Sequence, residues 1–161
     1  MTDGAITLPP ASVTCEVLTR REGVLSAVGH DLRIAATRSS WTVDLARGTL
    51  TGAIEAAGLQ VASALRGDHD APGALSAADR EMIDRAMRDD VLDVRRFPEV
   101  RVTATFERTD GKALVKGAVT IRGVERPFQV EATRDGAWWV ASCALDQTAF
   151  ATLVKTVTEV L

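Results

Sequence analysis

Apolar and polar residues alternate along most of this chain, with the period of two that a β-strand with one solvent-exposed face requires. Val115, Val119 and Ile121 fall on one face of such a run, and mostly polar residues fall on the other. Residues 123 to 126 can supply a tight turn, and Pro127 then opens a second alternating run. This stretch therefore predicts a β-hairpin.

The same alternation recurs through the chain and predicts about seven to nine strands, mostly joined as hairpins. The alternating runs cover residues 13–18, 32–36, 41–45, 50–54, 59–66, 100–107, 115–122, 127–133 and 139–145. A short helical turn is expected at residues 23–30. The last twelve residues are expected to begin as a helical turn and to end as a strand.

The period changes to that of a helix after Ser76. Met82, Ile83 and Met87 recur at helical spacing, and charged residues occupy the opposite face. Ser76 is a good N-cap residue, and Asp79 stands where a capping box has its acidic partner. The sequence therefore predicts one amphipathic helix inserted between two sets of strands.

Strands of this length either stack as a sandwich or close as a barrel. The inserted helix favours a barrel, because a helix can cover its open end and closure removes unpaired strand edges. The sequence thus predicts a mainly β fold, an antiparallel barrel of about eight strands with one inserted amphipathic helix and short helical turns. We expect a single domain over residues 1–161, in which residues 1–11 form a loosely ordered tail.

The expected inner face of this barrel is built from small side chains. Ala104, Gly117, Ala132 and Gly52 fall on it, and aromatic residues make up only 4% of the chain. This favours an open lumen that can hold a ligand over a lumen filled by side chains. A flattened barrel that collapses onto its small residues is the alternative.

Charge and composition exclude several classes of partner. The formal net charge is -3, and 19 basic and 22 acidic residues are mixed along the chain, so nucleic acid is not an expected partner. An export signal and a transmembrane segment are not recognisable, which predicts a cytoplasmic protein. Cys15 and Cys143 are expected to be free and reduced, with a disulfide between them as the alternative.

Three segments carry a family resemblance. They read VGHDLRI from Val28, REMIDRAMRDDVLDVRRFPEVRVTATF from Arg80, and VKGAVTIRGVERPFQV from Val115. In this order they resemble the YceI family of lipid-binding, lipocalin-like proteins, over roughly residues 13 to 155. The resemblance implies an extended antiparallel barrel whose apolar lumen binds a long isoprenoid or fatty chain. Two departures are the missing export signal, which many members carry, and FATLVK from Phe150 in place of a F-G-I-K-P type segment.

An enzyme built on histidine is the main rival to a binding protein. His30 and Asp31 are adjacent, and the segment GDHD places His69 between two aspartates in a Gly-rich loop. The loop is expected to be solvated, with its aspartates capping turns. Metal-ligand spacing, a nucleophile elbow and a P-loop are not found, so we expect no metal, cofactor or catalytic residue. A hydrolase or isomerase using His30 and Asp31 stays open as the alternative.

We therefore expect a non-enzymatic carrier of a long apolar molecule, such as an isoprenoid, a polyprenyl quinone or a fatty acyl chain, and a possible homodimer. His30 is expected at the barrel mouth, against a polar head group. A lumen without fixed polar partners should select its ligand by length and shape. The expected ligand-binding residues are Val17, His30, Leu32, Ile34, Phe106, Val119, Ile121, Phe128 and Trp139. A filled barrel that acts as a protein-interaction module is a further alternative.

Overall fold

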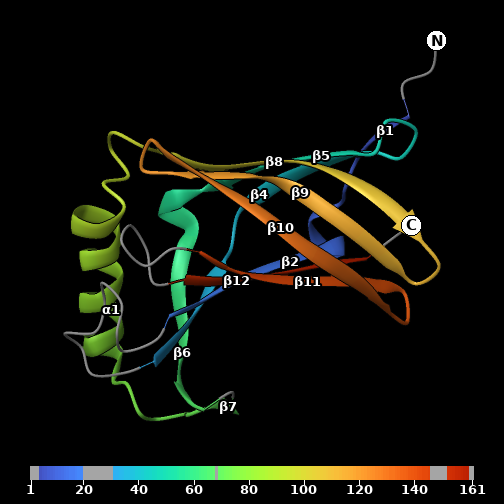
Figure 1. Ribbon diagram of the computed structural model, residues 1–161. Helices are drawn as coiled ribbons and strands as arrows, with labels where there is room; N and C mark the ends of the chain where they lie inside the picture. The colour runs from blue at the N-terminus through green and yellow to red at the C-terminus, as the bar shows by residue number, and fades with distance from the viewer. Residues whose placement is uncertain (1–3, 20–30, 68, 146–151, 160–161) are drawn as a thin grey trace.

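The computed structural model of the protein describes residues 4–19, 31–67, 69–145 and 152–159. Its strands are β1 (Ala5–Thr7), β2 (Val13–Thr19), β3 (Asp31–Ala36), β4 (Ser39–Asp44), β5 (Thr49–Glu55), β6 (Leu59–Arg66), β7 (His69–Asp70), β8 (Glu99–Thr109), β9 (Lys112–Ile121), β10 (Val124–Asp135), β11 (Trp138–Leu145) and β12 (Thr152–Glu159). They form one antiparallel sheet in the order β1-β4-β5-β8-β9-β10-β11-β12-β2-β3-β6-β7. The sheet curls, so that β5, β8 and β9 lie above β11, β12 and β2 in Figure 1. The predicted mainly β, antiparallel, barrel-like fold is confirmed, and short strands at both ends of the order raise the strand count.

One long hairpin, bent in its middle, joins the two ends of this strand order. Its two halves are the pairs β4–β5 and β3–β6. At the bend, the N–H of Thr37 donates to the carbonyl oxygen of Gly58 at 3.0 Å, and the N–H of Glu55 donates to that of Arg38 at 3.0 Å. Backbone pairing therefore continues around the corner, and the sheet closes through one continuous ribbon.

The predicted hairpin of β9 and β10 has a shorter turn than expected. Arg122 and Gly123 form it alone, with φ angles of 50° and 72°. Two consecutive positive φ angles define the type I′ turn, whose twist matches that of the flanking strands. The expected turn at residues 123 to 126 is therefore wrong, and Val124 already pairs with Ile121.

The inserted helix is α1 (Ala77–Ala86), which stands at one end of the barrel (Figure 1). Its predicted start is confirmed, because the Ser76 hydroxyl accepts from the N–H of Asp79 and the two residues form a capping box. Ile83 and Met87 are buried as expected, whereas Met82 is 59% exposed and does not belong to the core. The carboxylate of Asp84, on the helix, accepts from the N–H of Val61 in β6 at 2.9 Å. The helices of the described residues include none long and apolar enough to cross a membrane.

A π-helix, Met87–Val91, continues α1 and is held by the β9–β10 turn. The Arg122 guanidinium donates to the carbonyl oxygens of Asp90 and Val91, both at 3.2 Å. A Cβ added at Gly123 would lie 3.0 Å from the Phe97 ring. The turn is thus packed closely against the segment that follows the helix, and the helix is fixed to the barrel at two places.

The core gathers the inward side chains of both halves of the sheet with those of α1. Its fully buried members include Leu32 and Ile83. Residues Ala5–Thr7, in the expected N-terminal tail, pair with β4. Cys15 is buried in the core, and β12 lies between its strand and that of Cys143. Two strand spacings amount to roughly 10 Å, beyond the reach of a disulfide, so the alternative of a Cys15–Cys143 bridge is wrong.

Candidate functional site

The inner wall of the barrel is defined by the register of its central strands. Val102 of β8 stands opposite Val119 of β9, and both are buried in the core. Residues two apart along a strand share a face, so this pair fixes which side chains of β8, β9 and β10 point inward. The inward residues are Val100, Ala104 and Phe106 on β8, Ala113, Val115, Gly117 and Ile121 on β9, and Arg126, Phe128, Val130 and Ala132 on β10.

Six of the expected ligand-binding residues meet in one apolar cluster. Leu32, Ile34, Val119 and Ile121 are buried members of the core, and Val17 and Phe128 pack against it half-buried; the structure thus brings together Val17, Leu32, Ile34, Val119, Ile121 and Phe128. Leu32 has an exposed fraction of 0%, so no water-sized space touches it in this conformation. A ligand would reach Leu32 only after its neighbours had moved.

A row of inward apolar side chains crosses the wall toward the end of the barrel away from α1. Phe106 stands opposite Val115, and Val115 stands opposite Val130. All three are half-buried, although they share the inward face of their strands. The protein's own side chains therefore leave part of this inner apolar surface uncovered.

Two of the small inward residues are small for a reason other than an open lumen. A Cβ added at Gly52 would collide with the Trp41 ring, which is 4% exposed and covers this position. A Cβ added at Gly117 would collide with the backbone of Thr103 and Ala104 on β8. At Gly52 and Gly117, the inference from side-chain size to empty space is therefore wrong, because neighbouring groups fill that space.

Two more of the expected ligand-binding residues, Phe106 and Trp139, do not belong to the core cluster. Phe106 belongs to the half-buried row. Trp139 is half-buried and stands opposite Arg134, close to the β10–β11 turn. His30 lies outside the described residues, and its neighbour Asp31, half-buried, opens β3. The expected His30–Asp31 pair therefore stays a prediction.

Two inward polar groups were not expected from the sequence. Arg126 stands opposite the buried Val119, and its Nε is buried without a hydrogen-bond partner. The Oγ1 of Thr19 is likewise buried and unpartnered, in a residue that is 6% exposed. Because the sequence predicted a turn at residues 123 to 126, it did not assign Arg126 to either face of a strand. A two-residue turn at residues 122 and 123 would have placed it inward with Phe128.

The GDHD segment is more ordered than a solvated loop. Its His69 and Asp70 form β7, which pairs with Leu65 and Arg66 of β6. The Asp70 carboxylate accepts from Nε and Nη2 of Arg33, both at 2.9 Å, while Nη1 of Arg33 donates to Glu16 at 2.7 Å. These hydrogen bonds lower the pKa of Asp70 and raise that of Arg33 further above its ordinary value. The expectation that this aspartate is merely solvated is therefore wrong.

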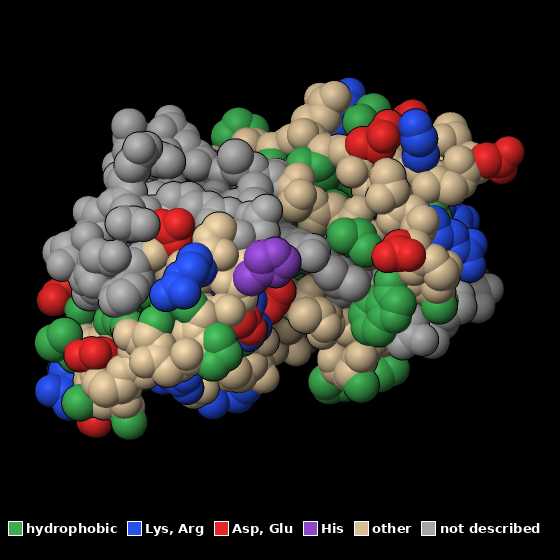
Figure 2. Space-filling view, turned by 90° about the horizontal axis from the view of Figure 1, so that it is seen from below, with side chains coloured by type: hydrophobic (Ala, Val, Ile, Leu, Met, Phe, Trp, Pro, Cys, Tyr) green, Lys and Arg blue, Asp and Glu red, His purple; other side chains and the backbone are tan. Residues whose placement is uncertain are grey.

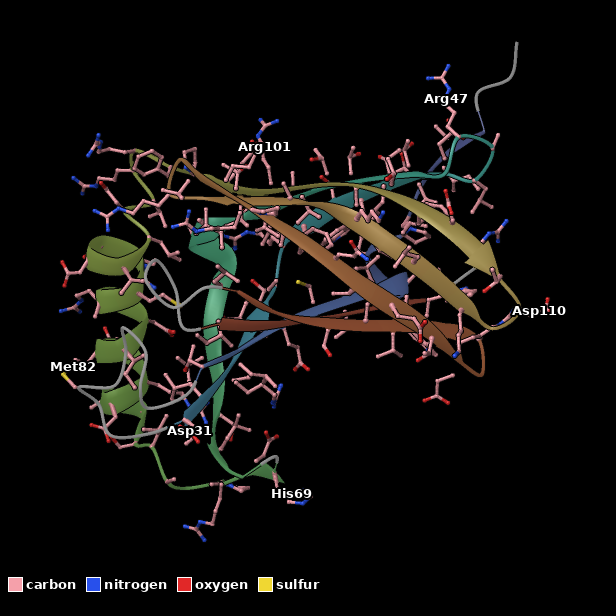
Figure 3. All side chains as sticks on the ribbon, viewed as in Figure 1. Asp31, Arg47, His69, Met82, Arg101 and Asp110 are labelled. Carbon is pink, nitrogen blue, oxygen red and sulfur yellow. The ribbon has the colours of Figure 1, made fainter. Side chains whose placement is uncertain are left out.

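A surface pocket lies beside β7. Its volume is about 610 Å³, and it is lined by Arg66, His69, Asp70, Ala71, Pro72, Gly73 and Ala74. His69 is exposed and points away from the barrel (Figure 3). The described part of the chain contains no group of three His, Cys, Asp or Glu residues that could hold a metal ion. On the described part of the face seen in Figure 2, basic and acidic side chains are interspersed.

Comparison with known proteins agrees with this architecture. The family model of the YceI-like domain matches residues 21–160. No curated protein gave a significant match. The solved structure of Burkholderia cenocepacia BcnA is 15% identical, with a TM-score of 0.64 over 96% of this chain and 99% of that chain.

Two further solved structures share the fold. A polyisoprenoid binding domain from Saccharophagus degradans, implicated in plant cell wall breakdown, is 9% identical, with a TM-score of 0.59 over 99% of this chain and 100% of that one. A mutant CJ YceI protein with a monobromobimane guest is 14% identical, with a TM-score of 0.57 over 80% of this chain and 82% of that one. Because the family model spans most of the sequence and the sheet has the same architecture, the chain belongs to the YceI-like family.

Proposed function

We propose that this protein binds and carries a long apolar molecule, such as an isoprenoid, a polyprenyl quinone or a fatty acyl chain, inside its barrel and without catalysis. The observation that carries this proposal is the row of Phe106, Val115 and Val130, which share the inward face of the wall and are only half-buried. Apolar surface that the protein does not cover is stabilised by an apolar guest. The description of the Saccharophagus degradans relative as a polyisoprenoid binding domain supports the same ligand class.

The hydrophobic effect restricts the guest to long chains. Burial of one CH2 group contributes about 0.8 kcal/mol, so a chain of about fifteen carbons contributes roughly 12 kcal/mol before costs. Association itself costs about 4–15 kcal/mol, so short chains gain too little to stay bound. The protein is therefore proposed to hold chains of at least that order of length.

Native mass spectrometry of freshly purified protein, followed by organic extraction, tests the proposal. We expect one lipid per chain in the native spectrum and the same lipid in the extract. Protein stripped of lipid should bind methyl cis-parinarate, a polyene ester that becomes fluorescent in an apolar environment. An empty protein whose stripped form also leaves this ester dark would contradict the proposal.

A cytoplasmic location and a homodimer stay predictions from the sequence. Cell fractionation measures the first. Light scattering of the purified protein with and without bound lipid measures the second.

A further inference from the structure

We propose that Arg126 anchors the anionic head group of the bound lipid, so that the cargo is an acid, a carboxylate or a phosphate, rather than a neutral hydrocarbon. This inference rests on the proposed function and names the ligand class more closely. It changes the expectation that the lumen selects by length and shape alone.

The position of Arg126 carries the argument. Arg126 pairs with Val119, which is 5% exposed, and directly paired residues of antiparallel strands point to the same face. The side chain of Arg126 therefore leaves its strand on the side of the core. Its neighbour on the same face, two residues along, is the half-buried Phe128.

The Nε atom of Arg126 lacks a hydrogen-bond partner among the described residues. This nitrogen is a buried donor, although the side chain as a whole is half-buried. Arg33 shows the contrast, since it donates to the carboxylates of Glu16 and Asp70 at 2.7–2.9 Å. A buried donor without an acceptor costs free energy, and an anion that accepts from it recovers that cost.

A second unpartnered group lies at the same end of the barrel. The buried Oγ1 of Thr19 belongs to the last residue of β2, which pairs with Leu32 of β3. This part of β3 pairs with β6, which is hydrogen-bonded to α1 through Val61 and Asp84. The start of β10 is fixed to the helical segment through Arg122. Both unpartnered groups therefore belong to the end of the barrel that α1 covers.

The chemistry of these groups selects the head group. A guanidinium only donates hydrogen bonds, and its fork matches the two oxygens of a carboxylate or phosphate. A hydroxyl such as that of Thr19 can also donate to an anion. The alkyl or isoprenoid part would then extend toward the half-buried row of Phe106, Val115 and Val130. A head at the α1 end and a tail toward the other end define the orientation of the cargo.

A matched pair of probes tests the anchor. cis-Parinaric acid and its methyl ester have the same polyene chain and differ only in the charge of the head group. At pH 8, where the acid is ionised, the wild-type protein should bind the acid about tenfold more tightly than the ester, as measured by fluorescence titration. Arg126→Met should abolish this preference while it binds the ester within about twofold of the wild type, which also shows that the variant is folded.

Two control variants sharpen the result. Arg126→Lys keeps the charge and should retain part of the preference. Arg101→Met removes an arginine of β8 that is exposed between the buried Val100 and Val102 and points away from the barrel in Figure 3, and it should behave as the wild type. Sodium acetate at the concentration of the probe should not displace the acid. Displacement by acetate would mean that a free small anion is the ligand, and it would overturn the anchor.

The outcomes separate this inference from the proposed function. Equal binding of acid and ester by the wild type would overturn the anchor and leave carriage of an apolar chain intact. A preference that persists in Arg126→Met would also overturn the anchor. Binding of neither probe would overturn the carriage itself, and the anchor with it.

Discussion

Arg33 joins three strands through its side chain alone. From β3 it donates to Glu16 on β2 and to Asp70 on β7. The side chains of Arg33 and Glu16 are 28% and 21% exposed, whereas that of Asp70 is 46% exposed, so solvent weakens the outer pair more. The bidentate geometry still fixes β7, a strand of only two residues, at the edge of the sheet.

The Arg33–Asp70 pair predicts a pH-dependent contribution to stability. Because Arg33 lowers the pKa of Asp70 below its ordinary value of 3.8, the pair stabilises the folded state above that pH. The contribution disappears as the pH falls through the lowered pKa. Asp70→Asn should therefore melt a few degrees below the wild type at pH 7, and the difference should vanish near pH 2, as measured by circular dichroism.

Glu125→Gln is the control for this measurement, since Glu125 is exposed on β10 and has no partner among the described residues. It should melt with the wild type at pH 7. An Asp70→Asn variant that melts with the wild type at pH 7 would show that the pair contributes nothing measurable.

Arg126 shows what sequence parity can and cannot place at the level of one residue. Alternation correctly put Val119 and Ile121 in the core, because residues two apart on a strand share a face and both side chains are buried. The length of the turn decides which side chains of β10 point inward. A type I′ turn at Arg122 is difficult to foresee, because a positive φ is unfavourable for residues with a Cβ. The hydrogen bonds that Arg122 makes to the π-helix explain why it is accepted there.

The contact between the β9–β10 turn and the π-helix joins two of the sequence segments that carry the family resemblance. Arg122 from the third segment donates to the backbone of Asp90 and Val91 in the second. These donors satisfy carbonyl groups at the end of a helix, which otherwise lack partners. The two segments are therefore needed together, as a single attachment of the helix to the barrel.

Asp84 is the other attachment, and its removal should loosen the helix. Asp84→Ala leaves the N–H of Val61 without its acceptor and should lower the free energy of unfolding by about 1–3 kcal/mol. Hydrogen exchange at the Val61 amide should become faster. Glu81→Ala is the control, because Glu81 is exposed and, among the described residues, pairs only with the exposed Arg85. Unchanged exchange at Val61 in Asp84→Ala would contradict this role.

Elements with strong local signals could be predicted, and elements that depend on distant neighbours could not. The run at residues 59–66 coincides with β6, and Ser76 starts the helix as expected. By contrast, β1 and β7 have three and two residues, and they exist only through pairing with β4 and β6. The bend at Thr37 and Gly58 also depends on pairing across the ribbon. Local alternation contains no information on these contacts.

Across the whole molecule, the barrel interior is unevenly packed. Near α1 the core is closed around Leu32, whereas the row of Phe106, Val115 and Val130 is half-buried. The alternation of apolar and polar residues predicted an apolar inner wall. The alternation could not show which part of the lumen is filled, because the ring of Trp41 on β4 covers Gly52 on β5.

A charge on the uncovered part of the wall should abolish binding of an apolar guest. Val115→Asp places a carboxylate on the inward face of β9 and should weaken binding of methyl cis-parinarate at least about tenfold, since burial of an unpaired charge is costly. Lys116→Asp places the same side chain on the exposed face of the same strand and should bind within about twofold of the wild type.

Circular dichroism and Val115→Ala serve as controls for folding. Val115→Ala removes apolar surface from the inner wall without adding a charge and should weaken binding only a few-fold. If Val115→Asp is folded and binds the ester as well as Lys116→Asp does, the guest does not lie against this row.

The pairing of β2 with β12 has a consequence for how the protein is made. Val13 of β2 stands opposite Thr158 of β12. Since β2 is made before β12, one edge of β2 has no partner strand until β12 has been synthesised. Until β12 emerges, both β2 and β11 present open backbone edges, the usual sites of unwanted strand addition. The wall of a nascent chain therefore cannot close before translation has passed Glu159 and β12 has left the ribosome.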